Sequence, residues 1–263
     1  MMSKEHSNKV AVISGGSRGI GKAIARQLAN EGADCLLAAL TESNLQATAE
    51  MIAEESGQRV EICAADLRTL AGCEAVHAKL QETFGRVDIL VNSAGATKGG
   101  RFLEQDDDVW QDGFALKFYG AVRLSRLLWP MLCERNGTVI NIIGGFARTP
   151  DPDFMIGGAV NAALANFTKA LAGLGLRDDV NVNAIHPGLT VTERLDEIFE
   201  GRAQLAGTTA DEAKQAAIAK EGIRRLGTPE DVAELVSYLC SAKARHIQGV
   251  AISVDGGATA GVY

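Results

Sequence analysis

The chain has 263 residues, of which 46% are hydrophobic and 22% are charged, so it can bury a large core and fits one α/β domain over 1–263 better than two small ones. A formal net charge of −7 argues against nucleic acid or an anionic membrane surface as a main partner. Residues 1–9 are polar and no segment reaches the length of a membrane span, which predicts a cytoplasmic protein. Five cysteines without ligand spacing predict free buried thiols and no metal site.

A glycine-rich turn follows the first predicted strand, 10–13, and opens an amphipathic helix over 22–30. The turn reads Ser14-Gly15-Gly16-Ser17-Arg18-Gly19-Ile20-Gly21. Glycines at 15, 19 and 21 would let the backbone approach a pyrophosphate closely, and the helix N-terminus would supply free N–H groups. The pattern predicts a dinucleotide site, although a glycine-rich turn can also be only a turn.

The second predicted strand, 33–40, and a helix in which Leu45, Ala49 and Ile52 recur at helical spacing complete a βαβ unit. An NAD-binding protein usually carries Asp or Glu at the end of this strand, but residues 38–41 read Ala-Ala-Leu-Thr. Without a carboxylate there, a 2′-phosphate is not repelled and Arg18 could pair with it. We therefore expect NADP in preference to NAD, with a solvated surface Arg18 as the alternative.

Alternating strands and helices continue to the end of the chain. Further strands are predicted at 60–64, 87–91, 138–143, 180–185 and 250–254, and further helices at 70–84, 107–132, 158–174 and 229–240. This order predicts a Rossmann-type, doubly wound parallel sheet of about seven strands flanked by helices. Helix 107–132 is apolar on more than one face, which indicates a central helix or a subunit interface and hence a homo-oligomer.

Residues 189–222 carry no strand signal but have helical patches at 193–199 and 211–220. A mobile helical lid over a substrate pocket would have this pattern, and so would a rigid helical insert.

Six motifs in this order resemble the short-chain dehydrogenase/reductase family over nearly the whole chain. They are Ser14–Gly21, Asp66, Asn92-Ser93-Ala94-Gly95, Pro187-Gly188 with Thr192, Arg225–Asp231 and Asp255-Gly256-Gly257. The resemblance implies an NAD(P)(H)-dependent oxidoreductase that acts on a small carbonyl or alcohol substrate and assembles as a tetramer or dimer. It also implies that Asp66 bonds the adenine amino group, that Asn92 steadies the central strand, and that residues 187–192 flank the nicotinamide. The cofactor-binding residues implied are Gly15, Ser17, Arg18, Gly19, Ile20, Gly21, Asp66, Leu67, Asn92, Ala94, Gly95, Asn161, Pro187, Gly188, Thr190 and Thr192.

All four catalytic positions of the resembled family differ in this chain. The family's Asn on the long helix corresponds to Lys117, its Ser after the fifth strand to Gly144, and its Tyr-x-x-x-Lys to Gly157 and Asn161. In the family the tyrosine donates a proton to the carbonyl oxygen, the serine holds that oxygen, and the lysine lowers the tyrosine's pKa. Loss of a general acid commonly costs ~10²–10⁴ in rate, so the chain is predicted to be an atypical member.

The family's Asn position holds Lys117 in this chain and its Lys position holds Asn161, so one ammonium and one amide are kept in exchanged places. Lys117 and Asn161 are therefore the candidate catalytic replacements. Lys117, partly desolvated, could donate a proton or stabilise an enolate, and Asn161 could bond a ribose hydroxyl. Coincidence, with Lys117 solvated at the rim, is the alternative. His186 and Tyr119 are the other candidate donors, although Tyr119 should face elsewhere on its helix.

Other side chains near these positions have two interpretations each. Phe146, Phe154 and Met155 could fill the volume left by the missing side chains, or that volume could stay open. Arg148 could bind a substrate carboxylate or phosphate, or pair with an aspartate of its own loop, Asp151 or Asp153. Two other functions stay open: a lyase or isomerase on the same fold, and a catalytically silent NAD(P)-binding protein.

Overall fold

The computed structural model describes residues 4–95 and 97–260, so the first and last three residues of the predicted domain lie outside it. Its centre is a seven-stranded sheet in the order β3-β2-β1-β4-β5-β6-β7, and every pair in it is parallel. The strands are β1 (Val10–Ser14), β2 (Asp34–Ala39), β3 (Val60–Ala64), β4 (Ile89–Asn92), β5 (Thr138–Ile142), β6 (Asn181–Pro187) and β7 (Ala251–Val254). The predicted fold class is confirmed, and the strand order reverses between β1 and β4, where such sheets bind ligands.

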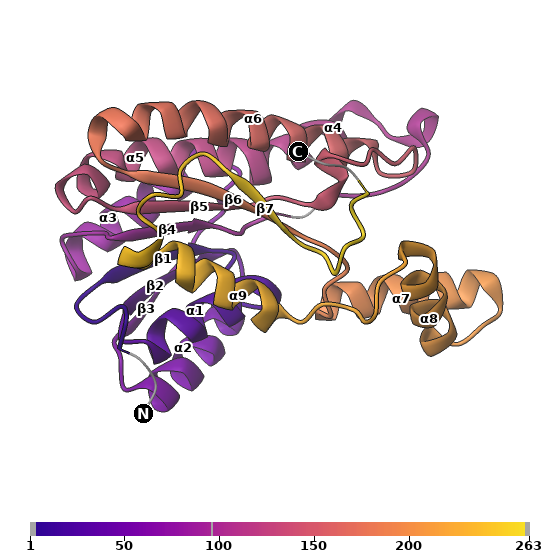
Figure 1. Cartoon of the computed structure of the whole chain (residues 1–263), viewed down its shortest axis with the longest axis horizontal. Coiled ribbons are helices and arrows are strands. Elements are labelled where there is room, and N and C mark those ends of the chain that lie inside the picture. The colour runs from indigo at the N-terminus through magenta and orange to yellow at the C-terminus, as the bar shows by residue number, and fades with distance from the viewer. Residues whose placement is uncertain (1–3, 96, 261–263) are drawn as a thin grey trace.

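Helices cover both faces of the sheet (Figure 1). On one face lie α1 (Gly19–Asn30), α2 (Glu42–Ser56) and α9 (Pro229–Leu239), and on the other lie α3 (Leu70–Thr83), α5 (Gly120–Glu134) and α6 (Met155–Asp178). Ala11 and Ile13 of β1 pack into the first layer, whereas Val10 and Val12 pack into the second. Because both faces are covered, β1, β2 and β4 are nearly continuous apolar runs instead of alternating.

The predicted long helix over 107–132 is present, but it is not a regular α-helix throughout. The segment consists of α4 (Asp107–Gly113), a π-helical turn, η2 (Phe114–Tyr119), and α5, which contains Pro130. A π-helical turn inserts an extra residue and so shifts the apolar stripe around the helix. This shift accounts for apolar residues on several faces in the sequence. Helix α6 also begins at Met155, three residues before the predicted start.

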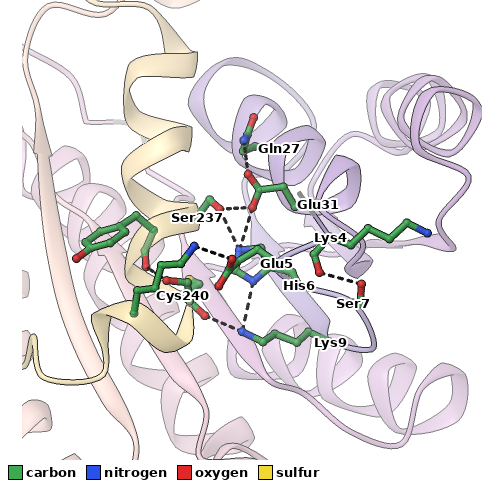
Figure 2. A network of polar contacts seen from close by, with 12 residues as sticks. Lys4, Glu5, His6, Ser7, Lys9, Gln27, Glu31, Ser237 and Cys240 are labelled. Atoms are coloured by element: carbon green, nitrogen blue, oxygen red, sulfur yellow. Dashed lines mark hydrogen bonds and ion pairs between the residues drawn. The ribbon is translucent and has the colours of Figure 1, made fainter. Parts of the chain in front are cut away.

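The N-terminal segment is fixed to the domain by a buried polar network (Figure 2). His6 is fully buried, and its Nε2 lies 3.0 Å from Ser237 Oγ of α9 and 3.3 Å from Glu31 Oε2 after α1. Lys9 Nζ donates to the Cys240 carbonyl at 2.8 Å. Burial lowers the pKa of His6 to about 4, so the imidazole is neutral near pH 7.

The five cysteines are free, but only Cys35, Cys73 and Cys240 are buried, so the prediction of burial is wrong for Cys63 and Cys133. Within residues 4–95 and 97–260, no group of three His, Cys, Asp or Glu side chains could hold a metal ion. No helix of that part of the chain is long and apolar enough to cross a membrane.

Candidate functional site

A cleft of about 510 Å³ opens at the carboxyl ends of the central strands, on both sides of the switch point between β1 and β4. Most of the predicted cofactor residues line it: Gly15, Ser17, Arg18, Gly19, Ile20, Gly21, Asp66, Leu67, Ala94, Gly95, Pro187 and Thr192. Lys117 and Gly144 line it as well. Asn92, Asn161, Gly188 and Thr190 are not among the lining residues.

The glycine turn leaves no room for side chains. A Cβ on Gly15 would lie 2.9 Å from the Ala94 backbone, and a Cβ on Gly21 would collide with the Gly15 carbonyl. Gly15 and Gly19 have φ values of 70° and 53°, which L side chains rarely adopt. Helix α1 begins at Gly19 and its first residues line the cleft. Bare backbone beside a helix N-terminus fits the pyrophosphate of a dinucleotide.

The wall of the cleft beside β2 is formed by Ala39 at the end of that strand, by Leu40 and Thr41 after it and by Asn44 of α2, none of which carries a charge. Arg18 lines the same cleft and is exposed. A phosphate bound here could pair with Arg18, and residues 39–41 and 44 have no carboxylate that would repel it.

Asp66 is held at the cleft by its neighbours. Its Oδ1 accepts hydrogen bonds from Arg68 N at 3.0 Å and from Arg68 Nη1 at 3.4 Å. Arg68 also donates from Nε to Asp112 Oδ1 at 2.5 Å, so its charge is neutralised by two carboxylates.

Asn92 lies beneath the cleft and ties the central strands together. Its Nδ2 donates to Asn141 Oδ1 of β5 at 2.8 Å and to Ser125 Oγ of α5 at 3.2 Å. Asn141 Nδ2 in turn donates to Thr168 Oγ1 of α6 at 2.8 Å. This chain of bonds fits the strand-steadying role expected of Asn92. Its own Oδ1 is buried without a hydrogen-bond partner in the part of the chain that the structure describes.

Neighbouring side chains occupy the space beside Gly157 and Gly144. The ring of Phe154 lies where a Cβ on Gly157 would be, and the Phe154 and Phe146 ring centroids are 4.9 Å apart. A Cβ on Gly144 would lie 2.6 Å from Asn161 Nδ2, and Asn161 Oδ1 accepts from the Gly144 N–H at 3.0 Å. Phe154 thus fills the space beside Gly157 as expected, whereas Met155, the first residue of α6, is exposed.

Lys117 reaches the cleft from the π-helical turn η2. Its side chain packs over Gly95, where a Cβ would lie 2.8 Å from Lys117 Cδ. Among the described residues, no carboxylate lies within 4.0 Å of Lys117 Nζ. Burial, with a smaller effect of the Arg194 charge, lowers the pKa of Lys117 to about 8. The ammonium is therefore a stronger acid than an exposed lysine.

The other candidate donors point elsewhere or are buried. Tyr119 lies in a separate groove with Arg123 over its ring, 5.4 Å from the ring centroid. His186 is buried, its Nδ1 lies 3.2 Å from the Gly144 carbonyl, and burial lowers its pKa. Arg148 donates to Ser253 Oγ at 3.0 Å and to the Ala251 carbonyl at 2.7 Å, both on β7.

Arg194 lines the cleft but was not among the residues predicted from the sequence. It is the second residue of α7 (Glu193–Ala206), and its Nη2 donates to the Thr97 carbonyl at 2.7 Å. Thr192 caps α7 by accepting from Leu195 N at 3.3 Å, and its Cγ2 would lie 3.3 Å from a Cβ on Gly19. The start of α7 thus spans the cleft from the glycine turn to the loop after β4. A helix-capping threonine followed by charged residues was the only sign of this in the sequence.

The remainder of the predicted lid forms two helices that extend from the body of the molecule (Figure 1). They are α7 and α8 (Ala210–Glu221), joined by an ion pair of 2.8 Å between Lys214 Nζ and Asp196 Oδ1. A capping box of Thr209 and Glu212 begins α8. Whether the pair moves as a lid stays a prediction.

Comparisons with known proteins agree on the type of protein. A family model described as enoyl-(acyl carrier protein) reductase matches residues 15–259. The chain is 36% identical to an uncharacterized oxidoreductase of Mycobacterium tuberculosis, over 96% of this chain and 92% of that protein. It is 32% identical to a 3-oxoacyl-[acyl-carrier-protein] reductase of Vibrio cholerae, over 95% of this chain and 96% of that protein.

Solved structures of similar fold include L-sorbose reductase from Gluconobacter frateurii complexed with NADPH and L-sorbose. Its TM-score is 0.95 at 35% identity, and the match covers 99% of this chain and 100% of that one. A short chain dehydrogenase from Burkholderia cenocepacia in complex with NADP matches with a TM-score of 0.85 at 29% identity, over 97% of this chain and 99% of that one.

Proposed function

Because the chain belongs to the short-chain dehydrogenase/reductase family, we propose that it is an NADP(H)-dependent oxidoreductase that reduces a small carbonyl compound, or oxidises the corresponding alcohol. The observation that carries the proposal is the continuous cleft that runs from the glycine turn to Lys117 and Gly144. NADPH and NADP are bound in the similar structures named above, and one of those proteins is a sugar reductase by name.

The residues of the cleft suit NADP better than NAD. Residues 39–41 at the end of β2 offer no carboxylate to ribose hydroxyls, and Arg18 can pair with a 2′-phosphate. Asp66 is proposed to accept from the adenine amino group, and the backbone of Gly19–Gly21 to hold the pyrophosphate. When bound, the reduced cofactor supplies the hydride.

We propose that Lys117 takes over the proton donor's role. Gly157 has no side chain and its space holds the Phe154 ring, so no hydroxyl is offered from that position. With a pKa of about 8, the Lys117 ammonium is mostly protonated at pH 7 and carries charge that can stabilise a developing oxyanion. These features also support the inference that the catalytic positions of the chain are atypical for the family.

Asn161 is the second proposed replacement. Since an N–H needs an acceptor, the bond from Gly144 N fixes Asn161 Oδ1 on the backbone and leaves its amide NH₂ beside the side-chain-free edge of Gly144. Asn161 is buried and does not itself line the cleft, but Gly144 does, so we propose that a ribose or substrate oxygen reaches this amide across Gly144.

We further propose a homo-oligomer, a tetramer or dimer, formed through the outer surface of α4, η2 and α5. A groove of about 460 Å³ there is lined by Trp110, Gln111, Phe114, Ala115, Tyr119 and Arg123. Tyr119 is 48% exposed, and grouped aromatic side chains on a surface are typical of interfaces.

The test is NADPH consumption with a panel of ketoses, 2-oxo acids and 3-oxoacyl thioesters, after calorimetric titration with NADPH and NADH. We expect NADPH to bind more tightly than NADH and at least one member of the panel to be reduced. Cofactor binding with no turnover by any member would favour the silent NADP-binding function, and conversion without a change in NADPH absorbance would favour a lyase or isomerase.

A further inference from the structure

Two cationic side chains meet at Gly95 in the cleft. The aliphatic stem of Lys117 packs over the α-carbon side of Gly95, with Cδ 2.8 Å from the position of a Cβ. Arg194 approaches the other side, where its Nη1 lies 3.4 Å from the Gly95 carbonyl. Both side chains are half-buried and line the cleft. A side chain at position 95 would separate them from this common contact.

The two charges lack nearby counter-charges. Arg194 donates to the carbonyls of Gly95 and Thr97, which are neutral acceptors. In the described part of the chain, neither Lys117 nor Arg194 has a carboxylate within 4.0 Å. By contrast, the third partly buried cation of the cleft, Arg68, is paired with Asp66 and Asp112.

The pKa values of Lys117 and Arg194 also indicate that their charges are not compensated. Burial lowers the pKa of Arg194, with a smaller effect of the Arg18 charge, and burial together with the Arg194 charge lowers the pKa of Lys117. Glu197, one turn along α7, offsets only part of the effect on Arg194. Two partly desolvated cations side by side are unfavourable unless an anion joins them.

We propose that Lys117 and Arg194 together bind an anionic group of the substrate, a carboxylate or a phosphate. A guanidinium offers a planar fork of donors and an ammonium a point charge, and the two together suit such an oxyanion. The inference rests on the proposed function, because it assigns the glycine-turn end of the cleft to the cofactor and the Gly95 end to the substrate. It narrows the substrate to a carbonyl compound that carries an acidic group.

Lys117 and Arg194 could also bind the pyrophosphate of the cofactor. The test therefore distinguishes a substrate anion from the cofactor's pyrophosphate. Oxalate and inorganic phosphate, which cannot accept a hydride, are titrated by calorimetry into protein saturated with NADPH and into protein without it. The variants are Arg194→Met, Arg194→Lys and Lys117→Met. Arg101→Met is the matched control, since Arg101 is 81% exposed, pairs with Glu104 and lies outside the cleft.

We expect saturable binding of at least one probe to the NADPH-saturated protein, weakened at least tenfold by Arg194→Met and by Lys117→Met. Arg194→Lys should lose less, and Arg101→Met should change nothing. Binding that NADPH abolishes would assign the pair to the cofactor and overturn the proposal. Absence of saturable binding to wild type, or equal binding by all variants, would also overturn it. If NADPH itself does not bind, the proposed function fails, and the titrations without NADPH still decide whether the pair binds anions.

Discussion

The ring of Phe154 occupies the space that a side chain at Gly157 would need. Gly157 is buried near the start of α6, and Phe154 precedes that helix and packs against Phe146. The position that would carry a tyrosine in the family is therefore closed by an aromatic ring. Restoring the hydroxyl would require this ring to move.

A pair of glycine substitutions on α6 tests this packing. Gly157→Ala should lower the free energy of unfolding by about 1–3 kcal/mol, because the new Cβ meets the Phe154 ring. Gly173→Ala on the same helix meets no atom within 4 Å and should raise it by roughly 0.5–1 kcal/mol through helix propensity. Urea denaturation measures both, and equal effects would contradict the packing argument. Adding Phe154→Ala should make Gly157→Tyr tolerable.

Lys117→Met should reduce kcat at least ~10²-fold if the ammonium assists the reduction. NADPH affinity should change less than about threefold, because the phosphate-binding backbone is untouched. Since the ammonium loses its proton as pH rises through its pKa of about 8, the wild-type rate of reduction should fall above that pH. The pH profile of kcat/KM from pH 6 to 9, which reports the pKa of the free enzyme, measures this. Lys98→Met, an exposed lysine, is the control, and an unchanged profile in Lys117→Met would exclude the role.

Arg18→Ala should weaken NADPH about tenfold, equivalent to roughly 1.4 kcal/mol, and NADH much less. The difference is expected because only NADPH carries the 2′-phosphate that Arg18 would bind at the end of β2. Competitive titration monitored by nucleotide fluorescence compares the two cofactors. Equal losses for both would show that Arg18 does not contact the 2′-phosphate.

The buried His6 should make the protein sensitive to acid. Its pKa of about 4 in the folded protein lies below the unfolded value near 6.5, so below pH 6.5 the unfolded chain binds the proton first. Stability should therefore fall as pH drops from 6.5 toward 4, by on the order of 3 kcal/mol. Thermal unfolding at pH 7 and pH 4.5 would measure the loss. His6→Gln, which cannot titrate, should lose less than wild type over the same interval.

The proposed oligomer should sediment as a dimer or tetramer at micromolar concentration. Tyr119→Asp together with Trp110→Asp would place charges in the aromatic groove and should shift the sedimentation toward monomer. A wild-type monomer under these conditions would contradict the proposed assembly.

The sequence predicts the sheet well because strands such as β1, β2 and β4 are apolar runs bounded by turn residues. It predicts the glycine turn because steric demands restrict the composition of that turn. The π-helical turn within 107–132 was not predicted, because apolar residues on several faces indicate a central or interface helix as well as a shifted register. Arg194 and His6 were missed for another reason. Their partners lie far away in the sequence, at residues 95 and 97 for Arg194 and at 31 and 237 for His6. Contacts of that separation depend on the assembled fold.

Lys117 lies in the π-helical turn η2, so the direction of the Lys117 side chain depends on the number of residues in segment 114–119. Each residue of a regular helix turns the chain by about 100°. Deleting one residue from 114–119 would allow a regular helix through this segment, and everything before the deletion would rotate by that angle relative to α5. Lys117 would then still be present in the sequence, but its ammonium would point away from the cleft. At this position, an insertion or deletion would alter the chemistry as effectively as a substitution.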